Sequence, residues 1–293
     1  MKTTVIIATF LALLPVSFIS GNRGMIPADP NVQIFEPNQR AMIVWSGDEE
    51  ILLLSTDLHA SDSTMLLEVL PLPSEPEVKK GDLETFRKAT DLINMKLYSE
   101  QTGKGRVLSE GVIVPSGEVT FHKRIGAHDI SVTHLLDGQG FVDWVVDYLK
   151  TRGVEGNVIS EDMRQLIEEY ITDGFAWYVF DVVSIGQETV TNEPIQYRFK
   201  SKDLFYPLKI TSTAEGSTSI ELLILTSRLL NSFPSLPIGR VRLKHDPVSI
   251  NVEELRQLNE DMYKLLEGCD QLRLRIWEIQ GELKEFNADL LAR

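Results

Sequence analysis

The stretch RAMIVWSGDEEILLLSTDL, residues 40–58, contains two apolar, partly β-branched runs separated by a short acidic turn. Ser46, Gly47 and Asp48 suit a tight turn, because glycine tolerates positive φ and the polar side chains bond to nearby backbone groups. Two such runs joined by such a turn predict a β-hairpin. The preceding NVQIFEP, residues 31–37, reads as a strand that its proline ends. We expect this hairpin to organise an antiparallel sheet.

Strand and helix patterns alternate on both sides of the hairpin. TMLLEVLPLP, residues 64–73, predicts a third strand that completes an antiparallel meander. Apolar residues recur at helical intervals in three segments, and in the last of them Ser160 is a candidate N-cap and Gly174 a candidate stop; the segments are 82–98, 140–153 and 160–174. Further strands are expected at 175–185, 195–199, 207–211, 219–227 and 239–245.

These elements predict an α+β fold, in which a mostly antiparallel sheet packs against several amphipathic helices. We expect one globular body over residues 22–250 and a long helix over residues 251–293. The length of 293 residues and a hydrophobic content of 43% provide a substantial core.

The predicted C-terminal helix rests on apolar residues spaced alternately three and four apart. Such a pattern keeps one seam turned toward a partner helix. The leading interpretation is an intermolecular coiled coil that makes the protein a homo-oligomer; the alternatives are a long helix folded back on its own body and a hairpin that breaks at Gly268. The candidate oligomerisation residues are Leu258, Met262, Leu265, Cys269, Leu272, Ile276, Ile279 and Leu283.

Cys269 is the single cysteine, so the chain cannot form an internal disulfide. On the predicted seam it is most simply a small core residue. In a parallel two-stranded coiled coil, its symmetry mate would lie across the axis, and an intersubunit disulfide becomes possible.

The N-terminus has the pattern of an export signal. Lys2 precedes an apolar run from Val5 to Ile19, and Ser20 and Gly21 provide small residues for cleavage. We therefore expect residues 1–21 to be a signal peptide, and the mature chain to be secreted or to reside in the cell envelope without a membrane span. Retention of this segment as an N-terminal membrane anchor is the alternative.

The charge of the chain bears on its partners. Its 43 acidic and 29 basic residues give a formal net charge of -14, which repels nucleic-acid phosphates at long range. We expect no nucleic-acid partner.

Two groups of polar residues are candidates for chemistry. In TDLHASDST, Asp57, His59 and Asp62 have the residue types of a general base or a metal site, although such residues also close turns. His122 and His128 are candidate metal ligands if the chain bend near Gly126 brings them together; partly exposed histidines are the alternative interpretation. We expect no cofactor.

The hairpin region also resembles a known family. The segments EPNQRAMIVW, EILLLST and PLPSEPEV, and more weakly RIGAHDISV and DLFYPLKIT, are similar to an exported prokaryotic family known as domain of unknown function 2330 (DUF2330). This resemblance implies export and a shared fold, and it assigns no catalytic residue.

No sequence motif of a known hydrolase or nucleotide-binding site is complete. The leading functional hypothesis is a non-enzymatic binding or scaffolding protein of the cell envelope that self-associates through its C-terminal helix. The alternative is a hydrolase or metal-dependent enzyme that uses Asp57, His59 and Asp62.

Overall fold

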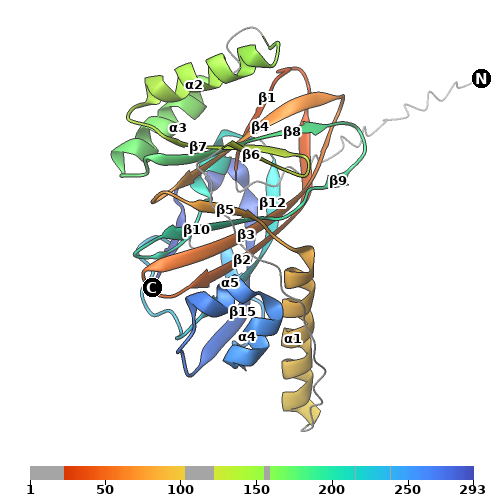
Figure 1. The fold of residues 1–293 in the computed structure, drawn as a ribbon, viewed down its shortest axis with the longest axis vertical. Helices are drawn as coiled ribbons and strands as arrows, with labels where there is room; N and C mark the ends of the chain where they lie inside the picture. The colour runs from red at the N-terminus through yellow and green to blue at the C-terminus, as the bar shows by residue number, and fades with distance from the viewer. Residues whose placement is uncertain (1–22, 103–121, 155–158, 215, 238) are drawn as a thin grey trace, which may run out of the picture.

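The structure is a computed structural model that describes residues 23–102, 122–154, 159–214, 216–237 and 239–293. Within these ranges the chain is mostly β and forms two large sheets, each covered on its outer face by helices (Figure 1). The predicted signal peptide lies outside the described residues.

The smaller sheet has five strands in the order β1-β4-β8-β7-β6. All its pairs are antiparallel. The strands are β1 (Gly24–Pro27), β4 (Thr64–Leu72), β6 (His122–Ile125), β7 (His128–His134) and β8 (Trp177–Ile185). Helices α2 (Gly138–Thr151) and α3 (Glu161–Thr172) pack on its outer face, where their apolar side chains meet Leu67, Val69, Tyr178 and Phe180.

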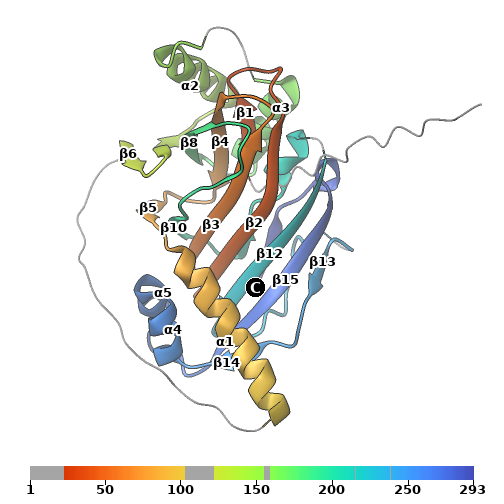
Figure 2. The same ribbon diagram turned by 90° about the vertical axis from the view of Figure 1, so that its right-hand side faces the viewer.

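The larger sheet has nine strands, seven of them in the order β13-β15-β12-β2-β3-β10-β5. Its strands are β2 (Ile34–Trp45), β3 (Glu49–Ala60), β5 (Glu77–Lys80), β9 (Val190–Thr191), β10 (Ile195–Lys200), β12 (Ser217–Thr226), β13 (Val241–Leu243), β14 (Val248–Ile250) and β15 (Leu272–Glu282). The pair β2–β12 is parallel. Helices α1 (Leu83–Thr102), α4 (Val252–Leu258) and α5 (Glu260–Leu265) lie against its outer face (Figure 2).

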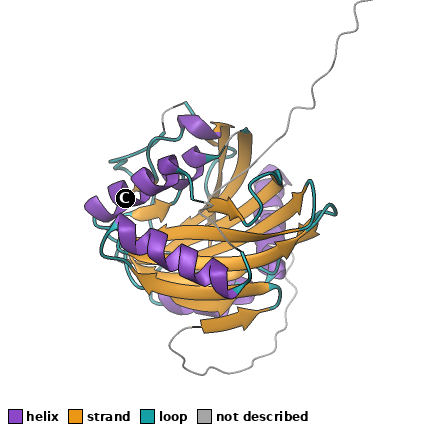
Figure 3. Cartoon of the chain, turned by 90° about the horizontal axis from the view of Figure 1, so that it is seen from above, coloured by secondary structure: helices purple, strands orange, loops and turns teal. Residues whose placement is uncertain are grey.

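Short elements close the remaining ends of the fold. Strands β11 (Leu204–Tyr206) and β16 (Leu290–Ala292) form a two-stranded sheet. Two 3₁₀-helices, η1 (Lys209–Thr213) and η2 (Leu283–Glu285), contact each other. Seen from above, strands run through the middle of the molecule with helices on its flanks (Figure 3).

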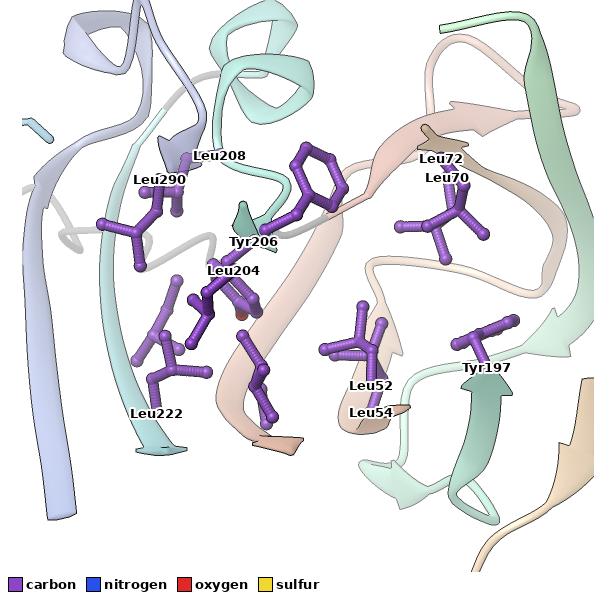
Figure 4. Packing of buried hydrophobic residues seen from close by; sticks show 14 of the residues in the cluster. Leu52, Leu54, Leu70, Leu72, Tyr197, Leu204, Tyr206, Leu208, Leu222 and Leu290 are labelled. Atoms are coloured by element: carbon purple, nitrogen blue, oxygen red, sulfur yellow. The ribbon is translucent and has the colours of Figure 1, made fainter. Parts of the chain in front are cut away.

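The alternation of side chains along each strand explains the layers. In β3, Leu52 and Leu54 face the other sheet, whereas Ile51 and Leu53 face the helices. A strand of this kind has no polar face, which accounts for the continuous apolar run in EILLLST. The core between the sheets contains leucines from both of them together with Tyr197 and Tyr206 (Figure 4).

The predicted hairpin is confirmed, but the predicted meander is wrong. Strands β2 and β3 pair antiparallel around a turn in which Gly47 has φ of 118°. The following strand, β4, crosses to the five-stranded sheet after a turn over residues 61–63. Alternation of apolar residues predicts a strand and its buried faces, but not which sheet the strand joins.

The prediction of an α+β fold with a long C-terminal helix is also wrong: the protein is mostly β, and it ends in a strand. Asn259 ends α4 and caps α5, and Gly268 turns the chain with φ of 90° after α5. Leu272 and Leu274 then alternate with arginines in β15, which is the two-residue period of a strand. The three-and-four spacing that predicted a helix includes Leu272 and Ile276 but leaves out Leu274, and it therefore missed this alternation.

Residues 251–293, all of which the structure describes, contain no coiled-coil seam, and the predicted oligomerisation through a C-terminal helix is not supported. Its supposed members belong to the core of a single chain: Leu258, Met262, Leu272, Ile276, Ile279 and Leu283 are buried, and Leu265 and Cys269 pack partly buried against the same core. Cys269 lies in the turn after α5, where its backbone N–H donates to the carbonyl of Leu266. The intersubunit disulfide therefore loses the geometry on which it rested.

Candidate functional site

A layer of charged side chains crosses the apolar core between the two sheets. On β4, Glu68 lies between Leu66 and Leu70, which are both buried. Asp181 lies directly opposite Glu68 on β8, so the two carboxylates share the inner face of the five-stranded sheet. Like charges at this spacing repel, and the layer therefore requires cations.

Arg23 supplies the first cation. It immediately precedes β1, at the edge of the same sheet, and its side chain points inward. Its Nη1 donates to Glu68 Oε2 at 2.6 Å and lies 3.5 Å from Asp181 Oδ2, while its Nη2 donates to the Tyr197 hydroxyl at 2.9 Å. Burial alone would lower the pKa of Arg23, but the charges of Glu68, Tyr197 and Asp181 outweigh it and raise the pKa. Because Tyr197 belongs to β10, Arg23 joins the two sheets.

His128 supplies the second cation. Its Nδ1 lies 2.6 Å from Asp181 Oδ2, and its Nε2 lies 3.0 Å from the backbone carbonyl of Glu193. A carbonyl only accepts, so Nε2 carries a proton, and a carboxylate oxygen that accepts from Nδ1 requires a second proton there. Burial would lower the pKa of His128, but the hydrogen bond and charge of Asp181 raise it overall. The geometry thus favours an imidazolium.

Glu36 is a third acid in this layer, and its surroundings favour the neutral form. A shift in strand register between Phe35 and Asn38 places both Glu36 and Gln39 in the buried interior. Gln39 Nε2 donates to Glu36 Oε1 at 2.9 Å, and the Tyr206 hydroxyl donates to Gln39 Oε1 at 3.0 Å. Burial and the nearby charge of Glu68 raise the pKa of Glu36 well above its usual value.

We call Arg23, Glu36, Glu68, His128 and Asp181 the core charge cluster. Its two cations, Arg23 and His128, face the carboxyl groups of Glu68 and Asp181, and burial favours the neutral form of Glu36. Each of the five residues is at most 3% exposed, so no substrate in solution reaches them in this conformation. The charged groups of the cluster therefore contact one another and the buried groups around them between the sheets.

A metal ion fits this cluster poorly. Ligand atoms of Glu68, His128 and Asp181 lie within 4.8 Å of one another, which is a spacing that could hold a cation. However, the guanidinium of Arg23 already lies 2.6 Å from Glu68, and both ring nitrogens of His128 have acceptors. A metal would have to displace both, at the cost of burying unpaired charges.

The structure gives the three predicted catalytic residues separate partners. Asp57 lies 3.6 Å from Arg40 Nη2, and Asp62 Oδ1 accepts from the backbone N–H of Ser63 at 2.7 Å. His59 stacks on Phe35, with ring centroids 4.7 Å apart, and its Nδ1 lies 3.2 Å from Thr189 Oγ1. These contacts are those of strand and turn residues.

Of the two predicted metal ligands, His128 belongs to the core charge cluster. The backbone of His122 pairs with Ser131 on β7, and its side chain lies outside the described residues. Sequence reasoning missed Arg23, Glu36, Glu68 and Asp181. A usable signal was present: Glu68 and Asp181 are single acids within otherwise apolar strands, where a charge must be buried and paired.

Asp289 forms a separate buried anchor near the C-terminus. Its Oδ1 accepts from the Tyr170 hydroxyl at 2.8 Å and from the backbone N–H groups of Leu208 and Lys209 at 2.9 and 2.8 Å. These bonds connect α3, the segment around η1 and the C-terminal segment. A buried carboxylate with three donors is well satisfied, and its loss would leave three donors unpaired.

The pKa shifts of buried acids and of His128 share one direction. Burial raises the pKa of Asp289 to about 6 and that of Glu50 well above its usual value, although the backbone N–H of Phe205 donates to Glu50 at 2.8 Å and opposes this shift. The pKa values of Glu36 and His128 are also raised. The folded chain therefore binds more protons than the unfolded chain near neutral pH.

We expect the protein to lose stability as pH rises from about 4 through neutral pH. A group whose pKa is raised by folding stabilises fully below its unfolded pKa, and this stabilisation is lost as pH rises through the folded pKa. For Asp289 that window runs from 3.8 to about 6 and involves about 3 kcal/mol. The loss continues above it through the glutamates and His128. Urea unfolding across this pH range measures the slope.

Glu36→Gln is the matched control for this slope. The amide keeps the oxygen that accepts from Gln39 but cannot ionise, so we expect this variant to be more stable than the natural chain at about pH 8 and to show a shallower slope. An unfolding free energy that increases between pH 5 and pH 8 would contradict the interpretation.

Fold and site together define a class: a two-sheet β protein with helices on both outer faces and a sealed, balanced charge cluster between the sheets. Residues 20–232 match the family described as "Uncharacterized protein conserved in bacteria (DUF2330)", and the chain belongs to this family. The resemblance seen in the sequence is thereby confirmed.

Two further comparisons accompany this assignment. No curated protein matches the chain. Among solved structures, the crystal structure of baculovirus P35 is similar with a TM-score of 0.41 and 9% sequence identity, over 90% of this chain and 97% of that chain. Within the described residues, no helix has the length and apolarity that a membrane span requires.

Proposed function

We propose that this chain is an exported, non-enzymatic binding protein of the cell envelope, in which the core charge cluster is a structural element. The observation that carries this proposal is the burial of the cluster. Asp181 and His128 form the hydrogen-bonded acid–imidazole pair that general-base catalysis uses, but each is only 1% exposed. Asp181 contacts Arg23, and His128 contacts the backbone of Glu193. These protein groups occupy the positions that a substrate would need, so the role of the pair is structural.

The export part of the proposal rests on the sequence of residues 1–21. Cleavage there would give a mature chain that starts near Gly21 or Asn22, just before Arg23 enters the core. N-terminal sequencing of protein recovered from outside the cytoplasm measures this start. A chain that retains Met1 would favour the anchored alternative.

A screen for hydrolysis tests the non-enzymatic part. We expect the purified chain to show no turnover of ester, phosphate, glycoside or peptide substrates above a heat-inactivated sample. Asp181→Asn and His128→Gln should lower thermal stability without a change in any activity, because their role is structural.

Turnover that disappears in Asp181→Asn, while circular dichroism shows an intact fold, would overturn the proposal and make the buried pair catalytic. His59→Ala serves as the parallel variant for the alternative site. Turnover lost only in His59→Ala would assign the chemistry to the Asp57, His59 and Asp62 group.

A further inference from the structure

Arg275 is a buried cation without a counter-ion. It lies on β15, is 2% exposed and faces the core between the sheets, opposite Ile224. In the described part of the chain it forms no ion pair: Nη1 donates to Thr226 Oγ1 and to the backbone carbonyl of Arg273, each at 3.0 Å, and Nη2 is buried without a partner. This contrasts with Arg23, whose charge is matched by two carboxylates.

Among the described residues, the charge of Arg275 has no neighbouring acid to offset its burial. On the same strand, Glu278 pairs with Arg242. Burial lowers the pKa of Arg275 to about 10, so the guanidinium stays charged at neutral pH. A buried, charged and unpaired guanidinium is costly, and an anion that reached Nη2 would remove that cost. The planar guanidinium is suited to a carboxylate, because it donates in parallel to both oxygens.

Apolar side chains border this cation at the edge of the nine-stranded sheet. Trp277 lies next on the inner face of β15, with its ring centroid 5.9 Å from the guanidinium carbon of Arg275. Phe233 packs on Trp277 with centroids 6.1 Å apart. Strand β13 lies beside β15 at the edge of the sheet (Figure 2), and its Leu243 is paired with Trp277. Phe233 and Leu243 are 43% and 46% exposed. We call Phe233, Leu243 and Trp277 the apolar edge.

The segment of residues 227–234 connects the cation with the apolar edge. It starts after Thr226, which accepts from Arg275, and includes Phe233, which packs on Trp277. It contains no helix or strand, and its backbone is tied to Arg293 through Asn231 and Ser232. Residues 228–230 belong to no helix or strand, and the carbonyl of Arg228 accepts from Thr226 Oγ1. Their displacement would break this bond but no sheet ladder, and a ligand needs such a displacement to reach Nη2, which is buried in this conformation.

We propose that Arg275 and the apolar edge form a binding site for a small carboxylate carried on an apolar body, such as an acyl or aryl carboxylic acid. The carboxylate pairs with Nη2 of Arg275, and the apolar body covers Phe233 and Leu243. A polyanion is disfavoured because the chain carries a net charge of -14. This proposal rests on the proposed binding function and names its ligand class.

Thermal shift and calorimetric titration with octanoate and with 4-phenylbutyrate test the site in the mature full-length chain. We expect saturable stabilisation by at least one carboxylate, and the comparison distinguishes an acyl from an aryl body. Octanol and acetate at equal concentrations should have little effect, because each lacks one half of the ligand. Absence of a shift with both carboxylates would overturn the proposal.

Arg275→Met and Arg273→Met form a matched pair on one strand. Arg275→Met should weaken carboxylate binding at least tenfold and should raise stability without ligand, because it removes an unpaired buried charge. The side chain of Arg273 donates to Ser249 and Gln271. Arg273→Met should therefore bind the carboxylate as the natural chain does. Equal binding in both variants would overturn the proposal.

Phe233→Ala gives a second test that does not depend on the folding of Arg275→Met, because Phe233 is partly exposed. We expect weaker binding of octanoate with no loss of fold, and unchanged affinity would count against the apolar edge. The two proposals fail separately. Absence of carboxylate binding together with absence of turnover removes only this site, whereas turnover that Asp181→Asn abolishes removes only the non-enzymatic function.

Discussion

Arg23→Met should lower the free energy of unfolding by about 3–5 kcal/mol, which is the range for breaking one side of a buried charge network. The substitution keeps the length of the side chain but removes its charge. Glu68 and Asp181 would then face each other across β4 and β8 with only His128 to balance them. The hydrogen bond to Tyr197, which connects the two sheets, would be lost as well. Urea unfolding followed by circular dichroism measures the change.

Arg40→Met is the control for this experiment. Arg40 has a side chain that is 44% exposed, and its Nη2 lies 3.6 Å from Asp57. A pair of this kind contributes about 0–1 kcal/mol, so the control should be close to the natural chain. Adding Glu68→Gln to Arg23→Met should restore part of the loss, because it removes one of the unpaired charges. Equal free energies of unfolding for Arg23→Met and Arg40→Met would show that the core charge cluster does not stabilise the packing of the two sheets.

Removal of residues 251–293 should abolish cooperative folding. This segment includes β15, which pairs with β12 over ten residues, from Arg273 to Glu282, and also pairs with β13 and β14. Its loss would expose two cores: the one between the two sheets, and the one between the nine-stranded sheet and its helices. We expect the truncated chain to be aggregated or unfolded by size-exclusion chromatography and circular dichroism. A truncated chain that melts cooperatively would contradict the placement of β15.

A point variant separates the strand from the general effect of truncation. Leu274→Asp places a charge at a position with 0% exposure, which should cost more than about 4 kcal/mol. Gln280→Asp, at an exposed position on the same strand, should cost less than about 1 kcal/mol. Similar stability of the two variants would contradict the burial of Leu274.

Local signals predicted local structure well: Ser160 accepts from the backbone N–H of Met163 as the N-cap of α3, and Gly174 has φ of 91° just after this helix. Such signals depend on backbone groups within a few residues. The β2–β3 hairpin was predictable for the same reason.

Long-range placement was much less predictable. One of the two partners of β4 is β8, more than a hundred residues away, and no local pattern distinguishes it from β3. The C-terminal segment was misread because a strand with both faces buried has few polar positions, so a helical count also fits it. Leu272, Leu274 and Ile276, which alternate with Arg273 and Arg275, were the better signal.

The core charge cluster depends on this long-range placement. Its members come from the entry of β1 and from β2, β4, β7 and β8, and their meeting follows from the topology of two sheets. The sequence did identify His128 as a candidate, but for metal binding. Arg23 is a single residue that precedes a short strand, and nothing local indicates that it is buried.

The parallel pair β2–β12 has a consequence for the kinetics of folding. Gln39 of β2 pairs with Ile220 of β12, so the middle of the nine-stranded sheet joins segments that are distant along the chain. Non-local pairing of this kind slows folding, because the entropy of closing a long loop is lost before the contact forms. Until β12 has been synthesised, the side of β2 that pairs with β12 has no partner strand and can pair with other chains. The late arrival of β12 therefore sets the period in which this protein is most vulnerable to aggregation.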